Sequence, residues 1–249
     1  MILELDHVTF GFSTEKQILK DLSLVLEKEY IYALMGTNGS GKTTLFNLIS
    51  GFLKLNSGKI IYNNKDITNK APYKINKEGI GRTFQDLRLI PKLTVKQNII
   101  LAMPDNPTDD WIKGMMPGSV FKKDLTILDE EAEKIIEDFF LGEVMNSMAN
   151  EISYGQQKLL NLACCVANGA ELLLLDEPVA GINQQYKKII SVLMRKLKLK
   201  GKTIFKIEHD TDFISETADC FLFLSEGRIS KFNNFDELKK SKETADAYF

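Results

Sequence analysis

The sequence predicts an α/β fold in which a mostly parallel sheet forms the core, preceded by antiparallel strands and interrupted by an inserted block of helices. Two observations support this fold class. Short continuous apolar runs end at Gly36 and at Asp176-Glu177, as expected of strands that are buried on both faces. Strands and helices then alternate from residue 172 onward, which is typical of an α/β sheet.

The first part of the chain is predicted to begin with strands. Residues 2–12 and 22–26 are rich in β-forming residues with partial alternation, and we expect them to be antiparallel strands. Residues 31–35 form a short apolar run that stops at a glycine, which indicates a buried strand. Residues 43–49 are then predicted to form a helix, and residues 80–84 another strand.

Helical character dominates from residue 86 to about residue 167, interrupted by the Pro- and Gly-containing residues 103–118. The elements predicted after this block are strands at 172–175 and 203–207, helices at 184–199 and 210–217, a β-ribbon around Gly227 and a last helix from Asp236. We therefore expect one domain spanning residues 1–249. It would contain a helical subdomain at about 86–167 inserted in the α/β core, and a C-terminal β-ribbon and helix at about 219–249.

Composition excludes several classes of function. The chain has 249 residues, and its formal net charge of -2 provides no basic field to attract nucleic acid, so we expect no nucleic-acid partner. No apolar run approaches the roughly 20 residues needed to span a bilayer, and the N-terminus lacks the features of a signal peptide. Three cysteines make no disulfide framework, which favours a reducing compartment. If the protein serves a membrane, we expect a partner to hold it there.

Residues 36–43 fit the pattern G-x4-G-K-[S/T] of a phosphate-binding loop. Glycines let consecutive backbone N–H groups converge on phosphate oxygens, and the helix that follows adds its positive N-terminal dipole. Lys42 can reach the β- and γ-phosphates, and the Thr43 hydroxyl can ligate Mg²⁺. Since a strand precedes the motif and a helix follows it, we interpret it as a nucleoside triphosphate site. The residues expected to hold the nucleotide are Gly36, Asn38, Gly39, Ser40, Gly41, Lys42, Thr43 and Thr44.

Two adjacent acids end the apolar run at residues 172–175. The carboxyl end of a parallel strand is where an open α/β sheet places its ligands. We expect Asp176 to hold Mg²⁺ directly or through water, and Glu177 to polarise the attacking water. With a phosphate-binding loop in the same chain, this interpretation outweighs a strand that simply ends in solvated charge.

The two histidines carry weaker signals. His209 follows the predicted strand at 203–207, where an imidazole could hydrogen-bond a γ-phosphate and sense its loss. A lone histidine is more often structural or exposed, so the pattern alone leaves both interpretations open. His7 is predicted to lie at the surface.

A second anion site is indicated by residues 153–157, which open a helix with an apolar face. Ser153 with Gln156 matches a capping box, and many helices begin this way for structural reasons alone. The functional alternative is that Ser153 and the N–H groups of this helix end bind phosphate. One triphosphate already occupies the first site, so the simplest arrangement is a head-to-tail pair in which each second site closes over the other chain's nucleotide.

Together these residues resemble the ATP-binding-cassette family over essentially the whole chain. Residues 36–43 resemble its Walker A motif, residues 153–157 its signature motif, and residues 172–177 its Walker B motif with the catalytic glutamate. The resemblance also identifies Gln85 with the Q-loop and His209 with the switch histidine. It implies a P-loop NTPase core of the RecA-like type, and an ATPase that uses ATP and Mg²⁺ to drive a transporter.

The resemblance also assigns roles to the site residues. It implies that Glu177, His209 and Gln85 serve hydrolysis, and that Thr43, Gln85 and Asp176 hold the metal. Phe12 falls where the family stacks an aromatic ring on adenine, a contact worth about 1–3 kcal/mol. The residues expected to bind the partner's ATP in trans are Ser153, Gly155 and Gln156.

The implied partners are transmembrane permease subunits, a second ATPase subunit (identical or a sister cassette) and, through the permease, an extracytoplasmic solute-binding protein. This arrangement implies a location at the cytoplasmic face of the membrane. Residues 82–85, 153–157, 180–183, 207–210 and 247–249 look most like the cassettes of branched-chain amino-acid importers. The alternatives are a cassette for another cargo, such as urea or amide uptake or lipid export, and a nucleotide-dependent switch without transport.

The sequence departs from the broad family pattern in three places. Tyr154 replaces a common glycine and Asn183 a common aspartate, both of which look typical of the importer subgroup. Residues 104–121 match no pattern, and we expect a packed insertion of the helical lobe in preference to an exposed docking surface.

Overall fold

The computed structural model describes residues 1–13, 16–104, 118–241 and 244, and the side chains of residues 118–125 are not described. Its core is a sheet with the strand order β10-β9-β3-β8-β7-β6, in which neighbouring strands from β9 to β6 run parallel and β10 is antiparallel to β9. The strands of this sheet are β3 (Ile31–Met35), β6 (Ile80–Arg82), β7 (Leu172–Asp176), β8 (Thr203–Ile207), β9 (Cys220–Ser225) and β10 (Arg228–Phe232).

The central strands are buried on both faces because alternate side chains enter two different apolar clusters. In β7, Leu172 and Leu174 contribute to the first cluster, whereas Leu173 and Leu175 contribute to the second. The continuous apolar runs seen in the sequence therefore reflect cover on both sides of the sheet.

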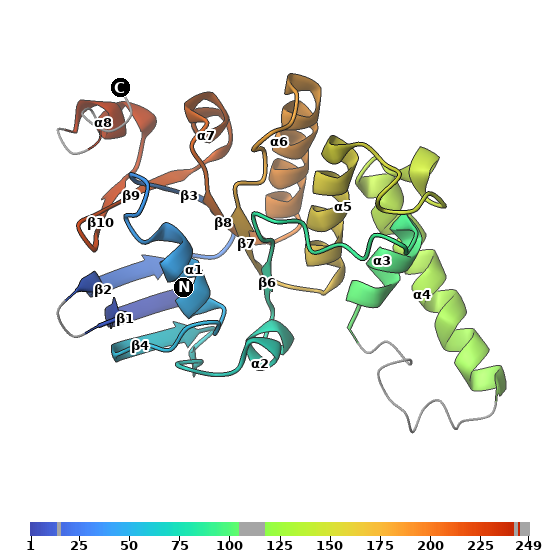
Figure 1. The fold of residues 1–249 in the computed structure, drawn as a ribbon, viewed down its shortest axis with the longest axis horizontal. Helices are drawn as coiled ribbons and strands as arrows, with labels where there is room; N and C mark the ends of the chain where they lie inside the picture. The colour runs from blue at the N-terminus through green and yellow to red at the C-terminus, as the bar shows by residue number, and fades with distance from the viewer. Residues whose placement is uncertain (14–15, 105–117, 242–243, 245–249) are drawn as a thin grey trace.

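An antiparallel sheet with the order β2-β1-β4-β5 lies beside this core, as Figure 1 shows. Its strands are β1 (Leu3–Gly11), β2 (Gln17–Leu26), β4 (Ser57–Tyr62) and β5 (Lys65–Asp66). Helix α1 (Lys42–Ile49) lies between the two sheets (Figure 1), and its Leu45 and Phe46 are fully buried in the first apolar cluster. This packing fixes the start of α1 at the end of β3.

The helices between β6 and β7 form the side of the molecule farthest from the antiparallel sheet (Figure 1). They are α3 (Val95–Ala102), α4 (Gly118–Asp138), a short 3-10 helix (Gly142–Val144) and α5 (Tyr154–Ala167). The second apolar cluster joins them to β7 and to α6 (Gln184–Leu199). No helix in the described part of the chain is long and apolar enough to cross a membrane.

The C-terminal part covers the sheet near β3 and β9. Helices α7 (Thr211–Thr217) and α8 (Phe235–Lys240) meet these strands in a third apolar cluster that includes Met35, Ile214 and Leu238. The C-terminal residues that resembled an importer cassette, 247–249, lie outside the described residues, as do residues 105–117 of the stretch that matched no pattern.

The predicted fold class is confirmed, with differences at the ends of elements. The strand expected at 80–84 ends at Arg82, and the strand expected at 22–26 begins at Gln17. The prediction assigned nothing to β4, β5 and α2 (Pro72–Lys77), because polar residues interrupt this region and hide its period. His7 is exposed, as predicted, with 72% of its side chain accessible.

Candidate functional site

The phosphate-binding loop connects β3 to α1. Gly41 is the N-cap of α1 and has φ 107, a left-handed conformation that side chains rarely adopt. A Cβ on Gly36 would lie 2.4 Å from the carbonyl oxygen of Leu224 in β9, so packing against the sheet also requires glycine there. These constraints curl the backbone ahead of the first turn of α1, where its N–H groups point outward.

Lys42 and Ser40 are the polar side chains of this loop that are buried or bonded to its backbone. The Nζ of Lys42 donates to the carbonyl oxygens of Gly36 at 2.7 Å and Thr37 at 3.0 Å. Burial lowers the pKa of Lys42, whereas the carboxylates of Glu177 and Asp176 raise it. The Oγ of Ser40 is buried and has no hydrogen-bond partner among the described residues. A buried hydroxyl without a partner is costly, which indicates a ligand with oxygen atoms at this position.

A cavity of about 310 Å³ opens above the loop. It brings together residues from five separate parts of the sequence, since β2, the phosphate-binding loop, the segment after β6, the end of β7 and the end of β8 all reach it. The predicted residues that line it are Asn38, Gly39, Gly41, Lys42, Thr43, Thr44, Gln85, Glu177 and His209. Ile18 and Ile207 also line it and were not predicted, because nothing in a β-branched residue of a strand marks it as a ligand contact.

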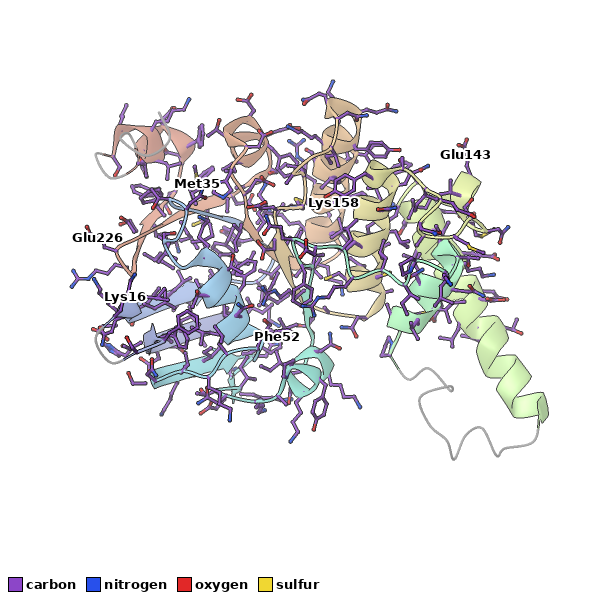
Figure 2. The ribbon with its side chains drawn as sticks, in the orientation of Figure 1. Lys16, Met35, Phe52, Glu143, Lys158 and Glu226 are labelled. Atoms are coloured by element: carbon purple, nitrogen blue, oxygen red, sulfur yellow. The ribbon has the colours of Figure 1, made fainter. Side chains whose placement is uncertain are left out.

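Several contacts and an unusual backbone conformation constrain Glu177 at this cavity. Its φ of 47 lies in the left-handed region, which is strained for a residue other than glycine. The Nε2 of Gln85 donates to its Oε2 at 3.2 Å, and the Nε2 of His209 lies 3.6 Å from its Oε1. The Nζ of Lys158 donates to its carbonyl oxygen at 3.1 Å, and Figure 2 shows Lys158 near the centre of the molecule, where α5 approaches β7. These contacts hold the carboxylate in place at the cavity.

Asp176 is buried and does not line the cavity. Its Oδ2 is 3.6 Å from Nη2 of Arg82, and both side chains are almost fully buried. Burial raises the pKa of Asp176, whereas the charge of Arg82 lowers it. The hydroxyl of Thr83 accepts a hydrogen bond from the backbone N–H of Asp176 at 3.2 Å.

Arg82 is a residue whose role the sequence did not reveal. Its Nη1 donates to Asn47 at 2.8 Å and to Ser50 at 2.7 Å, both at the C-terminal end of α1. Its guanidinium lies 4.7 Å from the ring centroid of Phe84. Burial lowers the pKa of Arg82 to about 10, so the group stays charged near neutral pH. One signal in the sequence could have identified Arg82. It is an arginine inside a predicted buried strand, close to Phe84 and Gln85.

His209 lies at the cavity wall beside Glu177. Burial lowers its pKa, the charge of Lys42 lowers it further, and Glu177 opposes both. The imidazole is therefore mainly neutral at pH 7, when one ring nitrogen donates and the other accepts a hydrogen bond.

The residues of the second predicted anion site form a capping box at the start of α5 and do not line this cavity. Ser153 is the N-cap of α5, its Oγ accepts from the N–H of Gln156 at 3.3 Å, and the capping box is complete. The Oγ of Ser153 also lies 3.3 Å from the hydroxyl of Tyr186. Neither Ser153, Gly155 nor Gln156 lines the 310 Å³ cavity.

Phe12 is likewise separate from the cavity lining. Its side chain is 74% exposed, and its ring contacts Phe10 edge-on with the centroids 5.1 Å apart. An exposed aromatic ring next to the antiparallel sheet can offer a stacking face to a planar ligand.

The arrangement suits a polyphosphate with a divalent cation. Lys42 supplies positive charge, and the loop supplies backbone N–H groups. Thr43 and Gln85 bring oxygen atoms to the same cavity, and oxygen atoms are the ligands that Mg²⁺ prefers. A fixed carboxylate, Glu177, faces the same space and can accept a proton from water.

Comparison with known proteins extends this interpretation. The family model described as ABC transporter matches residues 19–180. The high-affinity branched-chain amino acid transport ATP-binding protein BraF of Pseudomonas aeruginosa is 28% identical, over 99% of this chain and 97% of BraF. The probable branched-chain amino acid transport ATP-binding protein LivG of Archaeoglobus fulgidus is 32% identical, over 92% of this chain and 88% of LivG.

Solved structures show the same similarity. A nucleotide-free ATP-binding cassette from an ABC transporter has a TM-score of 0.84 and 31% identity, over 100% of this chain and 98% of that one. A dimeric ATP-binding cassette in a post-hydrolysis state, bound to ADP and Pi, has a TM-score of 0.75 and 25% identity, over 93% of this chain and 98% of that one. The similarity therefore extends over nearly the whole fold.

Proposed function

The chain belongs to the ABC transporter family, and we propose that it is the ATPase subunit of an importer of branched-chain amino acids. As a member of this family it binds ATP, and its ATP hydrolysis is coupled to transport. The single observation that supports hydrolysis best is the meeting of Lys42, Gln85, Glu177 and His209 at one cavity.

In this proposal the phosphate-binding loop holds the triphosphate. Lys42 neutralises the β- and γ-phosphates, and the hydroxyl of Ser40 gains the partner that it otherwise lacks. Gly36, Asn38, Gly39, Gly41 and Thr44 complete the cradle. Phe12 stacks on the adenine ring with its exposed face.

Mg²⁺ fits the oxygen donors at this place. Thr43 and Gln85 would hold it from the cavity, and Asp176 would hold it directly or through water. When bound, the ion neutralises charge on the phosphate oxygens.

Glu177 acts on the attacking water as a general base in this proposal. Its carboxylate is held by Gln85 and lies within reach of His209. His209, mainly neutral at pH 7, is suited to donate a hydrogen bond to the γ-phosphate. Hydrolysis then depends on positioning and charge neutralisation, as phosphoryl transfer does generally.

A second cassette, identical or a sister chain, completes each site. Ser153, Gly155 and Gln156 bind the partner's ATP with the N-terminal end of α5, and this arrangement is supported by their absence from the lining of their own chain's cavity. The dimeric state of the similar cassette bound to ADP and Pi also supports this arrangement.

The membrane partners are permease subunits, which hold the chain at the cytoplasmic face, together with an extracytoplasmic solute-binding protein. The cargo is proposed from BraF and LivG, whose names specify branched-chain amino acids. The similarity to BraF covers almost the full length of both chains, which supports the same kind of assembly.

A binding titration tests the nucleotide site. Lys42→Ala is expected to weaken the binding of fluorescently labelled ATP to the purified chain at least about tenfold, because a charge-assisted contact worth 1.5–3 kcal/mol is lost. Lys188→Met, an exposed lysine on α6, is the matched control. Equal affinity in the wild type and Lys42→Ala would contradict the assignment.

Uptake measurements test the cargo. In source cells that lack this chain, uptake of labelled leucine, isoleucine and valine is expected to fall, and the wild-type chain but not Glu177→Gln should restore it. Unchanged uptake of all three amino acids, together with a defect in urea or amide uptake or in lipid export, would replace the proposed cargo and leave the ATPase assignment intact.

A further inference from the structure

The first turn of α6 lies between the signature residues 153–157 and the segment that carries the switch histidine. Tyr186 and Lys187 are adjacent in this turn. The Oδ1 of Asn183, the N-cap of α6, accepts from the backbone N–H of Tyr186 at 3.1 Å, which holds the turn in place.

Tyr186 contacts the signature with both its ring and its hydroxyl. A Cβ on Gly155 would lie 2.3 Å from Cδ2 of Tyr186, so the ring packs directly on the glycine backbone. The hydroxyl of Tyr186 lies 3.3 Å from Oγ of Ser153. Tyr186 therefore occupies one side of the serine that the proposed function assigns to the partner's phosphate.

A reciprocal contact holds the same two segments together. A Cβ on Gly181 would lie 3.2 Å from Cε1 of Tyr154, so the ring of Tyr154 rests on the turn that leads into α6. Each tyrosine thus packs on a glycine of the other segment. Because packed groups have few alternative arrangements, the start of α5 and the start of α6 must move together.

Lys187 connects the same turn to the switch histidine. Its Nζ lies 2.5 Å from Oδ2 of Asp210, the residue after His209. The other carboxylate oxygen of Asp210 caps α7 by accepting from the N–H of Phe213 at 2.9 Å. Any displacement of Lys187 therefore acts on the residue next to His209, whose ring is 3.6 Å from Glu177.

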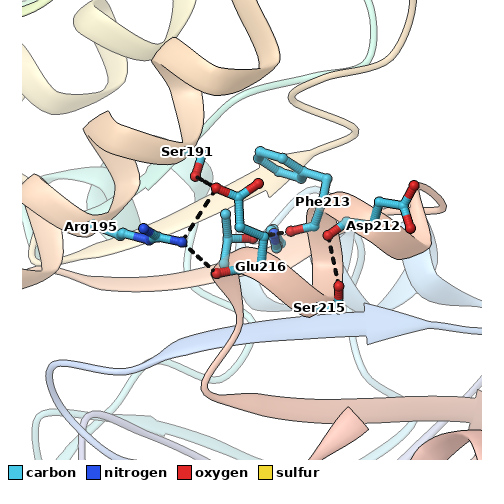
Figure 3. Close-up of polar contacts among 8 residues, drawn as sticks. Ser191, Arg195, Asp212, Phe213, Ser215 and Glu216 are labelled. Atoms are coloured by element: carbon cyan, nitrogen blue, oxygen red, sulfur yellow. Dashed lines mark hydrogen bonds and ion pairs between the residues drawn. The ribbon is translucent and has the colours of Figure 1, made fainter. Parts of the chain in front are cut away.

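Further contacts fasten α6 to α7 along their length. Figure 3 shows Ser191 and Arg195, one and two turns after Lys187, both reaching Glu216 on α7. The Oγ of Ser191 donates to Oε1 of Glu216 at 2.9 Å, and Nη2 of Arg195 donates to its carbonyl oxygen at 2.9 Å. The two helices are thus suited to move as one unit.

We propose that Tyr186 and Lys187 are positioning residues that couple, within one chain, the partner's nucleotide at Ser153 to His209 and Glu177. When a phosphate approaches Ser153, the hydroxyl of Tyr186 has to change its hydrogen bond, and the linked turn of α6 carries that change to Asp210. This inference rests on the proposed function, which assigns the partner's nucleotide to the signature.

The test measures ATP hydrolysis by the purified full chain as a function of ATP concentration, together with the affinity for labelled ATP. Tyr186→Phe removes only the hydroxyl, and Lys187→Met removes only the charge. Each is expected to lower kcat about fivefold or more, the lower end of usual coupling between sites, and to reduce the Hill coefficient toward 1. The affinity for labelled ATP should stay within about twofold, since neither residue lines the 310 Å³ cavity. The double variant should be no slower than the slower single variant, because both act on one path.

Matched controls separate coupling from folding. Tyr73→Phe changes a tyrosine that is 62% exposed on α2, and Lys188→Met changes the next lysine along α6, which forms no ion pair within the described part of the chain. Lys187→Arg keeps the charge opposite Asp210 and should restore kcat and the Hill coefficient. Thermal unfolding of every variant detects any loss of stability.

The outcomes distinguish this inference from the proposed function. A cooperative wild type with variants of unchanged kcat and Hill coefficient would overturn the coupling alone. The same holds if Lys187→Arg is as slow as Lys187→Met, because the lysine would then serve only packing. A wild-type chain that neither hydrolyses ATP nor dimerises with it would overturn the proposed function and this inference together.

Discussion

At the scale of single residues, Glu177 illustrates how the structure prepares a carboxylate for chemistry. Its backbone N–H donates to the carbonyl oxygen of Ile207 at 3.1 Å, and its carbonyl oxygen accepts from Lys158. These bonds hold the left-handed conformation, which costs of order 1–3 kcal/mol for a residue with a side chain. Glu177 lines the cavity from this strained backbone, whereas the preceding Asp176 is buried and does not line it.

Glu177→Gln should separate ATP binding from ATP hydrolysis. The amide keeps the shape of the side chain but cannot accept the proton of the attacking water, so turnover should fall on the order of 10²–10⁴-fold. ATP affinity should be unchanged. Phosphate-release kinetics and a labelled-ATP titration measure the two quantities, with the exposed Glu143→Gln as control. Turnover at the wild-type rate would contradict the role of Glu177.

Lys206 on β8 is a second residue with an unusual environment. Its side chain is fully buried, donates to the hydroxyl of Thr217 and lies 4.0 Å from the ring centroid of Phe213. Burial lowers its pKa to about 7, although the acidic side chains of Glu208, Asp210 and Glu216 oppose this shift. The unfolded chain therefore binds this proton more tightly than the folded chain.

This shift predicts a pH-dependent effect of Lys206→Met. The buried amine disfavours folding most below its folded pKa of about 7, and the effect disappears above the unfolded value of 10.5. The variant should raise the Tm at pH 7, and the gain should be smaller at pH 9.5. Calorimetry at both pH values measures the Tm of the wild type and of Lys206→Met, with Lys188→Met as control. A variant less stable than the wild type at pH 7 would refute the prediction.

At the scale of elements, the contact between α5 and α6 depends on glycines. Gly155 is buried in the first turn of α5, where the ring of Tyr186 leaves no room for a methyl group. The turn before α6 likewise keeps Gly181, with φ 76, against the ring of Tyr154. A larger residue at Gly155 or at Gly181 would therefore push the starts of these two helices apart.

Gly155→Ala tests this packing. We expect it to lower the free energy of unfolding by about 1–3 kcal/mol, the usual cost of overpacking, and to cost less in a Tyr186→Ala background because the clash is gone. Urea denaturation of the single and double variants measures the coupling. Gly142→Ala, where a Cβ would meet nothing within 4 Å, is the control. An equal loss of unfolding free energy in both backgrounds would show that the ring of Tyr186 does not cause the overpacking.

At the scale of the whole molecule, the two predicted nucleotide-binding surfaces belong to different parts. The cavity lies where α1 meets the ends of β7 and β8, and the signature begins a helix of the second apolar cluster. Since the signature does not line its own cavity, a second copy is the simplest way to bring the two surfaces together.

This separation predicts an ATP-dependent dimer. Glu177→Gln, which should bind ATP without hydrolysing it, is expected to form dimers with ATP and remain monomeric with ADP. Light scattering on a size-exclusion column measures the mass. Lys42→Ala should stay monomeric in both nucleotides, because it lacks the contact that retains the triphosphate. A monomer of Glu177→Gln at saturating ATP would contradict closure by two copies.

The elements whose signals are local could be predicted from the amino-acid sequence. The phosphate-binding loop, the buried strand β7 with its terminal acids and the capping box at Ser153 each depend on residues close together in the chain. Backbone conformation and burial on both faces impose such patterns directly, so they can be recognised without coordinates.

Tertiary structure alone decided which distant residues meet. The pairing of Arg82 with Asp176, the burial of Lys206 and the contact of Tyr186 with Ser153 leave no periodic trace in the chain. Each depends on packing between elements far apart in sequence, where a charge or a ring gains a partner only once the sheet and helices have assembled. The local patterns identified the residues expected to bind nucleotide, whereas the packing determined which other residues contact them.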